Sequence, residues 1–307
     1  MMTGAALPTP LMVVVSVVGA LLVLGALRDV FLTLWHPSGQ GRLSGYVSTV
    51  LWRAARRIGP RAQNHAGPAV LVAVIVVWGS LVVVGCALVY WPWVPEAFVY
   101  GSGVPEGRWA GALDALYVSA VVLGTLGFGD IVPASGVLRL VAAGEALVGF
   151  GLLTAGMSWV QQITPALQRR RSLAGELDAL ARSARAAGSG AEHDEDGDED
   201  EDDAHGLPPL HVIDDLVRSV VAVRVDLWQH AQTYYFRDSD PSVALDLALP
   251  IASRVAHRAC TVPSHRDAGR RLGVALDLLA ELLAEQHVPG EGDRDAVFRR
   301  YAADQAR

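Results

Sequence analysis

Three long apolar stretches dominate the first half of the chain. Residues 1–27 and 68–95 carry no charged side chain, and residues 136–163 carry only Arg139 and Glu145. A helix needs about 20 apolar residues to cross the hydrocarbon core of a bilayer. Each stretch meets this length, so the pattern predicts three transmembrane helices in a multi-pass protein of the cell membrane.

The first stretch has a second interpretation, a secretory signal peptide. Such a peptide begins with a positively charged region, and no Lys or Arg precedes Arg28. We therefore expect a true span that begins near Pro10 and ends between Leu27 and Trp35. Arg28 and Asp29 are adjacent at its end, where a mutual ion pair at the membrane interface would account for both.

Two groups of arginines follow the first and the third stretch. They are Arg42, Arg53, Arg56, Arg57 and Arg61, and then Arg169, Arg170 and Arg171. Loops rich in Lys and Arg stay in the cytoplasm, so this distribution predicts an N-terminus outside and a cytoplasmic C-terminus. The first group also includes Trp52 and is typical of a helix lying on the inner surface of the bilayer.

The connection between the second and third stretches is unusually long and contains another apolar segment. Residues 96–108 are rich in Gly and Pro, which predicts an exposed loop. Residues 111–123 are largely apolar, Asp114 aside, and as a helix would be only about 20 Å long. A helix of this length can enter a bilayer but cannot cross it, so we expect a re-entrant helix.

A segment punctuated by glycine follows the re-entrant helix: Thr125, Leu126, Gly127, Phe128, Gly129 and Asp130. At membrane depth, backbone without helical hydrogen bonds is tolerated only where it is buried in protein or lines water. Alternating right- and left-handed conformations would turn successive carbonyls to one side, and glycine adopts the left-handed state at the least cost. With Gly127 and Gly129 left-handed, the carbonyls of residues 125–128 would face one axis, and Leu126 and Phe128 would pack back against the short helix.

A ladder of carbonyl oxygens can replace the water shell of a desolvated monovalent cation. One chain supplies one strand of such a ladder, so a closed ring requires several chains, and four is the number that known filters use. The carboxyl end of the short helix would add negative partial charge below the ladder. Asp130, at the outer end, would concentrate cations at the mouth.

Residues 116–133 resemble the pore helix and signature filter of two-transmembrane pore-loop potassium channels, a family of ion channels found in prokaryotes. The similarity extends from about residue 68 to residue 162. It implies a potassium-selective homotetramer in which Thr125 to Gly129 form the selectivity filter and Asp130 is the outer acidic residue. The first span lies outside the similarity and would be an extra N-terminal transmembrane helix.

Two residues of the third span are further candidates. Gly149 falls where family members often place a gating hinge, although close helix packing would also explain it, as it would explain Gly144 and Gly151. Glu145 is an ionisable residue inside a span, which makes it a functional candidate by default. We expect Glu145 to be buried behind the filter with hydrogen-bond partners, as a support of the pore.

The segment departs from the family pattern at three positions. Gly124 replaces the usual threonine before the filter, which is expected to loosen the helix end. Phe128 stands where tyrosine is commonest and lacks the hydroxyl that could brace the filter. Val121 stands where some members carry a buried acid, so Asp130 would lack that partner. These departures leave a non-selective cation channel open as an alternative.

The second half of the chain has a different character. Residues 168–187 continue the helical spacing of the third span, and residues 188–206 are strongly acidic, which predicts a disordered linker. Helical periodicity returns after residue 207, with Asp240 and Pro241 as a cap and first turn, which predicts a small α-helical cytoplasmic domain. The predicted divisions are residues 1–35, 36–67, 68–167, 168–187, 188–206 and 207–307.

Composition excludes several other classes of protein. A 51% hydrophobic share with 19% charged residues is high for a soluble protein, and the net charge of −7 arises mainly from residues 192–203. This acidic run could also enrich cations below a pore. No long basic face with interleaved aromatics appears, so we expect no nucleic-acid partner. His257, Cys260 and His265 have a spacing that could recruit a metal, but the set is incomplete, and we expect no metal site and no cofactor.

The sequence therefore predicts an all-α membrane protein with three transmembrane helices, a re-entrant helix and a filter loop. Its expected partners are further copies of itself, the lipid bilayer, K⁺ ions and an unknown regulatory ligand or partner of the cytoplasmic domain. No span carries arginine at every third position, so a voltage sensor is not expected. No catalytic elbow or phosphate loop appears, so we do not expect an enzyme. A membrane sensor or scaffold with a vestigial pore loop is the alternative from another class.

Overall fold

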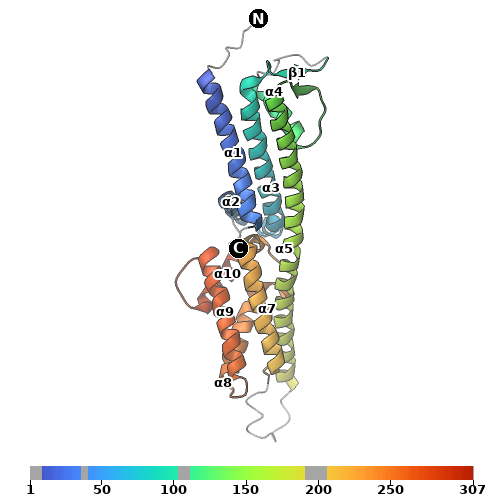
Figure 1. Ribbon diagram of the computed structural model, residues 1–307. Helices are drawn as coiled ribbons and strands as arrows, with labels where there is room; N and C mark the ends of the chain where they lie inside the picture. The colour runs from blue at the N-terminus through green and yellow to red at the C-terminus, as the bar shows by residue number, and fades with distance from the viewer. Residues whose placement is uncertain (1–8, 36–40, 103–110, 191–205, 307) are drawn as a thin grey trace. The chain divides into compact units, whose positions relative to one another are not determined.

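The structure, a computed structural model, describes residues 9–35, 41–102, 111–190 and 206–306 (Figure 1). Residues 103–108 of the expected Gly/Pro-rich loop and the whole acidic run, residues 192–203, lie outside the described residues. Within the described residues nearly all regular structure is helical, which confirms the predicted all-α class.

Three helices are long and apolar enough to cross a membrane. They are α1 (Thr9–Trp35), α3 (Pro60–Tyr90) and α5 (Gly136–Gly190). Their candidate spans cover Pro10–Trp35, Arg61–Trp93 and Gly136–Ala186. These helices include residues 9–27, 68–90 and 136–163 of the three apolar stretches, so the prediction of three helices long enough to cross a membrane agrees with the structure.

The chain divides into two compact units. The first comprises residues 1–36, 40–47 and 71–161, and the second comprises residues 37–39, 48–70 and 162–307. The helices α2 (Arg42–Ile58), α3 and α5 contribute residues to both units. The predicted division of the chain into six segments stays a prediction.

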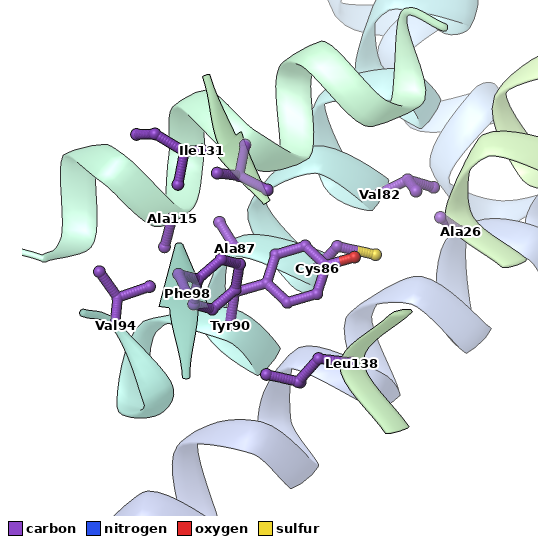
Figure 2. Packing of buried hydrophobic residues seen from close by; sticks show 11 residues of the cluster. Ala26, Val82, Cys86, Ala87, Tyr90, Val94, Phe98, Ala115, Ile131 and Leu138 are labelled. Atoms are coloured by element: carbon purple, nitrogen blue, oxygen red, sulfur yellow. The ribbon is translucent and has the colours of Figure 1, made fainter. Parts of the chain in front are cut away.

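The core of the first unit surrounds the short helix α4 (Ala112–Leu123), which corresponds to the predicted re-entrant helix. Figure 2 shows Tyr90 from α3, Phe98 from a short strand and Ala115 from α4 together in this core. The rings of Tyr90 and Phe98 meet edge to face, with their centroids 5.9 Å apart. Apolar packing therefore joins α4 to the helix that precedes it.

Two short strands, which the sequence did not predict, bracket α4 and the glycine-rich segment. β1 (Phe98–Tyr100) follows a single 3-10 turn, η1 (Trp91–Trp93), and pairs antiparallel with β2 (Ile131–Pro133). Phe98 lies opposite Pro133, and Tyr100 lies opposite Ile131. Each strand has three residues, which is too short for an alternating pattern to be recognised.

Asp29, at the end of α1, has different partners from those expected. Its carboxylate accepts hydrogen bonds from the backbone N–H of Leu43 at 2.9 Å and of Ser44 at 3.1 Å, at the N-terminus of α2. The indole of Trp78 on α3 donates a third bond, at 2.9 Å. Asp29 therefore caps α2, where a negative charge is favourable, rather than pairing with Arg28.

The second unit contains a bundle of helices with its own core. After α7 (Leu210–Gln229) and the 3-10 turns η2 (Ala231–Tyr235) and η3 (Pro241–Val243) come α8 (Leu245–Thr261), α9 (Arg266–Gln286) and α10 (Arg294–Ala306). The leucines of α9 that follow helical spacing are fully buried: Leu272, Leu276, Leu279 and Leu283. Asp240 does act as a cap, because its carboxylate accepts a hydrogen bond from the backbone N–H of Ser242 at 2.9 Å, but the capped element is the turn η3, and α8 begins only at Leu245.

Polar contacts tie the ends of this unit together. Asp304 on α10 accepts hydrogen bonds from Trp52 at 3.0 Å and from Tyr234 at 2.6 Å. Trp52 is only 4% exposed, so this aromatic residue of the basic segment is packed inside protein rather than presented to lipid. The imidazole of His287 stacks on Tyr234, with centroids 4.0 Å apart, and burial lowers its pKa to about 4.

The three arginines after the third apolar stretch form ion pairs within the second unit. Arg169 makes two hydrogen bonds to Asp226, at 2.7 and 2.6 Å. Arg170 is 4% exposed and binds the carbonyl of Thr233 at 2.7 Å and Asp238 at 2.8 Å. These cations hold the C-terminal part of α5 to the segments around η2.

Candidate functional site

The glycine-rich segment begins where α4 ends. The backbone N–H of Gly124 donates to Ala120, that of Thr125 to Val122 and that of Leu126 to Val121, at 2.9 to 3.0 Å. The helix, which ends at Leu123, is therefore followed by three more hydrogen-bonded residues, and Gly124 itself is in the right-handed region with φ −70°. Helical hydrogen bonding thus continues past Gly124, and a loosening of the helix end at this residue stays a prediction.

Every second residue of the segment is left-handed. Thr125 has φ 55°, Gly127 has φ 56° and Gly129 has φ 75°, whereas Leu126 and Phe128 have negative φ. Among the described residues Thr125 is the only non-glycine residue with positive φ, a conformation that is uncommon for such residues. The sequence suggested the left-handed state for the two glycines but not for Thr125.

The glycines are needed for conformation rather than for space. No heavy atom lies within 4 Å of a Cβ built at Gly127, and at Gly129 the nearest is the Gly127 carbonyl oxygen at 4.0 Å. A side chain would fit at either position within one chain. Its cost would come from the positive φ, at about 1–2 kcal/mol per residue.

Leu126 and Phe128 are not buried against the short helix within a single chain, in contrast to the expectation from sequence. In the single chain Leu126 is 61% exposed and Phe128 is 65% exposed. Two adjacent large apolar side chains on an open loop need a cover in the functional protein. The chain itself does not provide it within the described residues.

Asp130 has a partner that the sequence reasoning missed. The hydroxyl of Tyr117 on α4 donates to its carboxylate at 2.7 Å, and the carboxylate also accepts from the backbone N–H of Ile131 at 3.1 Å. Tyr117 lies one turn before Val121 on the same face of α4, because residues four apart share a helix face. Because Val121 cannot form a hydrogen bond with Asp130, the four-residue spacing from Tyr117 to Val121 was the signal in the sequence that Tyr117 could do so.

The strand pair holds the outer end of the segment. The backbone N–H of Gly101 donates to the Asp130 carbonyl at 2.7 Å and continues the β1–β2 pairing. Tyr100 on β1 donates to Asp114 in the first turn of α4, at 3.0 Å. Asp114 is 8% exposed and is therefore a structural link between β1 and the start of α4.

Glu145 lies in a polar contact between three helices. It is 3% exposed, and Tyr90 on α3 donates a hydrogen bond to it at 2.6 Å. The hydroxyl of Ser119 on α4 lies 2.5 Å from its other oxygen and 2.9 Å from the Val83 carbonyl of α3. Glu145 on α5 is thus buried and connected to both neighbouring helices, while its role as a support of the pore stays a prediction.

Gly149 makes a close backbone contact. A Cβ built there would lie 2.1 Å from the carbonyl oxygen of Leu123, the last residue of α4. Gly144 and Gly151 have no heavy atom within 4 Å of a built Cβ. Helix α5 continues through Gly149, so the contact favours the packing interpretation, and the hinge stays a prediction.

No group of three His, Cys, Asp or Glu side chains that could hold a metal ion occurs in the part of the chain that the structure describes. Of the residues with metal-like spacing, His265 has its Nδ1 atom 2.9 Å from the hydroxyl of Ser264.

Comparison with known proteins agrees with this geometry. Residues 73–164, which include most of α3, all of α4, the glycine-rich segment and the first half of α5, match a family described as "Ion channel". A relative described as the uncharacterized membrane protein YdjJ, of Bacillus subtilis (strain 168), is 31% identical over 157 residues. The match covers 50% of this chain and 45% of that protein, so the chain spans about half the length of the relative. No solved structure matches the chain.

Proposed function

We propose that this membrane protein is one subunit of a potassium-selective homotetramer, a proposal that the match of residues 73–164 to a family described as "Ion channel" supports. Residues 125–129 would form the selectivity filter, and K⁺ would pass through it down its electrochemical gradient. The alternating left-handed conformation of Thr125, Gly127 and Gly129 is the observation that carries the proposal.

The alternation supports a carbonyl-lined path. In an extended strand successive carbonyls point to opposite sides, whereas alternating handedness turns them to the same side. The carbonyls of residues 125–128 would then replace the water around a desolvated cation. Oxygen ligands alone suit a hard ion such as K⁺, which agrees with the absence of His or Cys in the segment.

The exposed side chains of the segment support several subunits. One strand cannot surround an ion, and its carbonyls would be unpaired at membrane depth. Neighbouring copies would complete the ring, and they would also cover Leu126 and Phe128, which are 61% and 65% exposed in one chain. Four copies is the arrangement used by carbonyl-lined potassium filters.

The charges at the two ends of the proposed filter also favour the passage of a cation. The carboxyl end of α4 carries negative partial charge directly before Thr125, which favours a cation below the filter. Asp130 adds a carboxylate at the other end, and Tyr117 holds it in place. We place this end and the N-terminus outside the cell, and the second unit in the cytoplasm, from the distribution of arginine.

A flux assay tests the proposal. The purified full-length chain is reconstituted in liposomes, and uptake of Rb⁺ is measured with K⁺ or Na⁺ as the competing ion. We expect K⁺ to compete strongly with Rb⁺ and Na⁺ to compete weakly. Equal competition by Na⁺ would indicate a non-selective cation channel, and absence of flux would indicate a sensor or scaffold with a vestigial pore loop.

A further inference from the structure

A pocket of about 740 Å³ lies in the second unit, between α8 and α10. Its volume falls in the range of about 300–1,000 Å³ that small-molecule sites occupy. Apolar groups form part of its wall, including Pro250 and the ring of Phe298, which is 1% exposed. The pocket therefore has a size and a rigid base suited to a small ligand.

The wall of this pocket is strongly basic. Four arginines line it against one carboxylate: Arg254, Arg258, Arg294 and Arg299, with Asp295. Asp295 lies 3.7 Å from Arg294, which also pairs with Asp277 at 3.1 Å. Both of these carboxylates are therefore engaged with Arg294.

Three of the basic side chains have no partner within the described residues. Arg254 and His257 on α8 and Arg299 on α10 make no hydrogen bond or ion pair there. Arg254 and His257 are three residues apart and share a face of α8. Other arginines of the same unit are paired, such as Arg271 with Asp214 at 2.7 Å. Like charges gathered without counter-charge repel one another, so an anion in the pocket would be favourable.

A buried hydroxyl also lacks a partner. Ser253 lines the pocket, is 6% exposed, and has no hydrogen-bond partner for its Oγ among the described residues. Burying a polar group without a hydrogen-bond partner costs free energy. Serines within helices commonly avoid this cost by donating to a backbone carbonyl of the preceding turn, and Ser253 does not. A ligand oxygen in the pocket would satisfy this hydroxyl as well as the arginines.

We propose that this pocket binds a small phosphate-bearing anion. The guanidinium groups of Arg254 and Arg299, one from each helix, bind the phosphate oxygens, because their planar N–H groups match phosphate in geometry and charge. Ser253 donates a further hydrogen bond from the wall, and Phe298 packs beside the less polar part of the ligand. The proposal thus assigns a class of ligand to the second unit. It does not depend on whether the chain conducts ions.

Binding of inorganic pyrophosphate to the full-length protein tests this site. The chain is held in nanodiscs of phosphatidylcholine, and binding is measured by isothermal titration calorimetry at low salt. We expect saturable binding that weakens about 100-fold in the double variant Arg254→Gln/Arg299→Gln, since each charge-assisted contact contributes about tenfold. The variant Arg270→Gln, which changes an exposed arginine of α9, is the matched control and keeps the affinity.

Circular dichroism checks the folding of the double variant, which we expect to be folded because both substituted side chains are exposed and glutamine is a good helix former. Absence of saturable binding to the unaltered protein would overturn the proposal. Equal affinity in the double variant, or the same loss in Arg270→Gln, would also overturn it, because binding would then be non-specific.

A second arm distinguishes a soluble ligand from a lipid headgroup. The titration is repeated in nanodiscs that contain phosphatidic acid. If a headgroup occupies the pocket, pyrophosphate binding is suppressed there; if the ligand is soluble, the affinity is unchanged. Both results support the phosphate site and identify its source. The flux assay is separate, so failure of the channel proposal would leave this binding result intact.

Discussion

The substitution Gly127→Ala tests the backbone of the filter. Gly127 has φ 56°, and a methyl group there would meet no heavy atom within 4 Å, so the cost in one chain is conformational. The left-handed state costs a non-glycine residue about 1–2 kcal/mol. Four copies around one axis would raise the cost of the conducting filter by about 4–8 kcal/mol.

A cost of this size would strongly reduce the population of the conducting filter conformation. Each 1.4 kcal/mol is about tenfold in an equilibrium, so the conducting fraction would fall by on the order of a thousandfold or more. We expect selective K⁺ flux in liposomes to disappear while membrane insertion and assembly of the chain are kept. Native mass spectrometry of the variant checks the assembly. Retained selectivity of Gly127→Ala would refute the argument from handedness.

Two controls separate handedness from added volume. D-alanine at position 127, introduced by ligation, favours positive φ and carries the same methyl group, so we expect it to conduct. Gly25→Ala, in α1, has no heavy atom within 4 Å of the new Cβ and no unusual φ. We expect this variant to behave like the unaltered protein. Loss of flux in both alanine variants would show that the effect at position 127 is not specific.

Three further predictions concern the surroundings of the site and the second unit. Gly149→Ala is expected to destabilise the first unit by about 1–3 kcal/mol, because the new Cβ would lie 2.1 Å from a backbone oxygen. The new Cβ of Gly151→Ala would lie in open space, so this variant should be less destabilised. Thermal unfolding in detergent measures the stability of both variants. Tyr90→Phe removes a hydrogen bond to buried Glu145 and is expected to cost about 1–3 kcal/mol by the same measurement. Burial lowers the pKa of His287 to about 4, so the unfolded chain binds a proton at this residue more readily than the folded chain, and the folded state loses stability as the pH drops from about 6.5 toward 4. The free energy of unfolding is expected to fall by about 2 kcal/mol between pH 7 and pH 5. His287→Gln should remove this part of the pH dependence.

Matched variants accompany these predictions. Tyr46→Phe changes a tyrosine that is 71% exposed and should leave the thermal transition unchanged. His211→Gln changes an exposed histidine of α7 and should keep the pH dependence. Equal destabilisation by Gly149→Ala and Gly151→Ala would contradict the packing interpretation, and an unchanged pH profile in His287→Gln would contradict the assignment of that dependence to His287.

The large elements could be predicted from the sequence because their signals are strong and local. Apolar runs of membrane length correspond to α1, α3 and α5, and the short apolar run before Thr125 corresponds to α4. The need for left-handed backbone at Gly127 and Gly129 also follows from residue type. These properties depend on composition and on residues that are close in the chain.

The contacts between distant segments could not be predicted in the same way. The pairing of β1 with β2 depends on strands of three residues separated by the whole of α4. Asp29 was assigned to its sequence neighbour Arg28, but its partners lie on α2 and α3. Trp52 was placed at the lipid surface because of its basic surroundings, yet it is buried beside Asp304, which lies 252 positions later.

The left-handed Thr125 shows a further limit of sequence reasoning. Residue type argues against this conformation, because a β-branched side chain rarely adopts positive φ. The surrounding structure imposes it between the end of α4 and Gly127. Strained backbone of this kind is typical of functional positions, and it is visible only once the fold is known.

The arrangement of the filter in the assembled protein can be measured most directly by single-particle electron cryomicroscopy of the chain in nanodiscs containing K⁺. Our account predicts four copies around one axis, with the carbonyls of residues 125–128 facing that axis and ion density between them. A monomer in the bilayer, or residues 125–129 lying in solvent away from any symmetry axis, would contradict it.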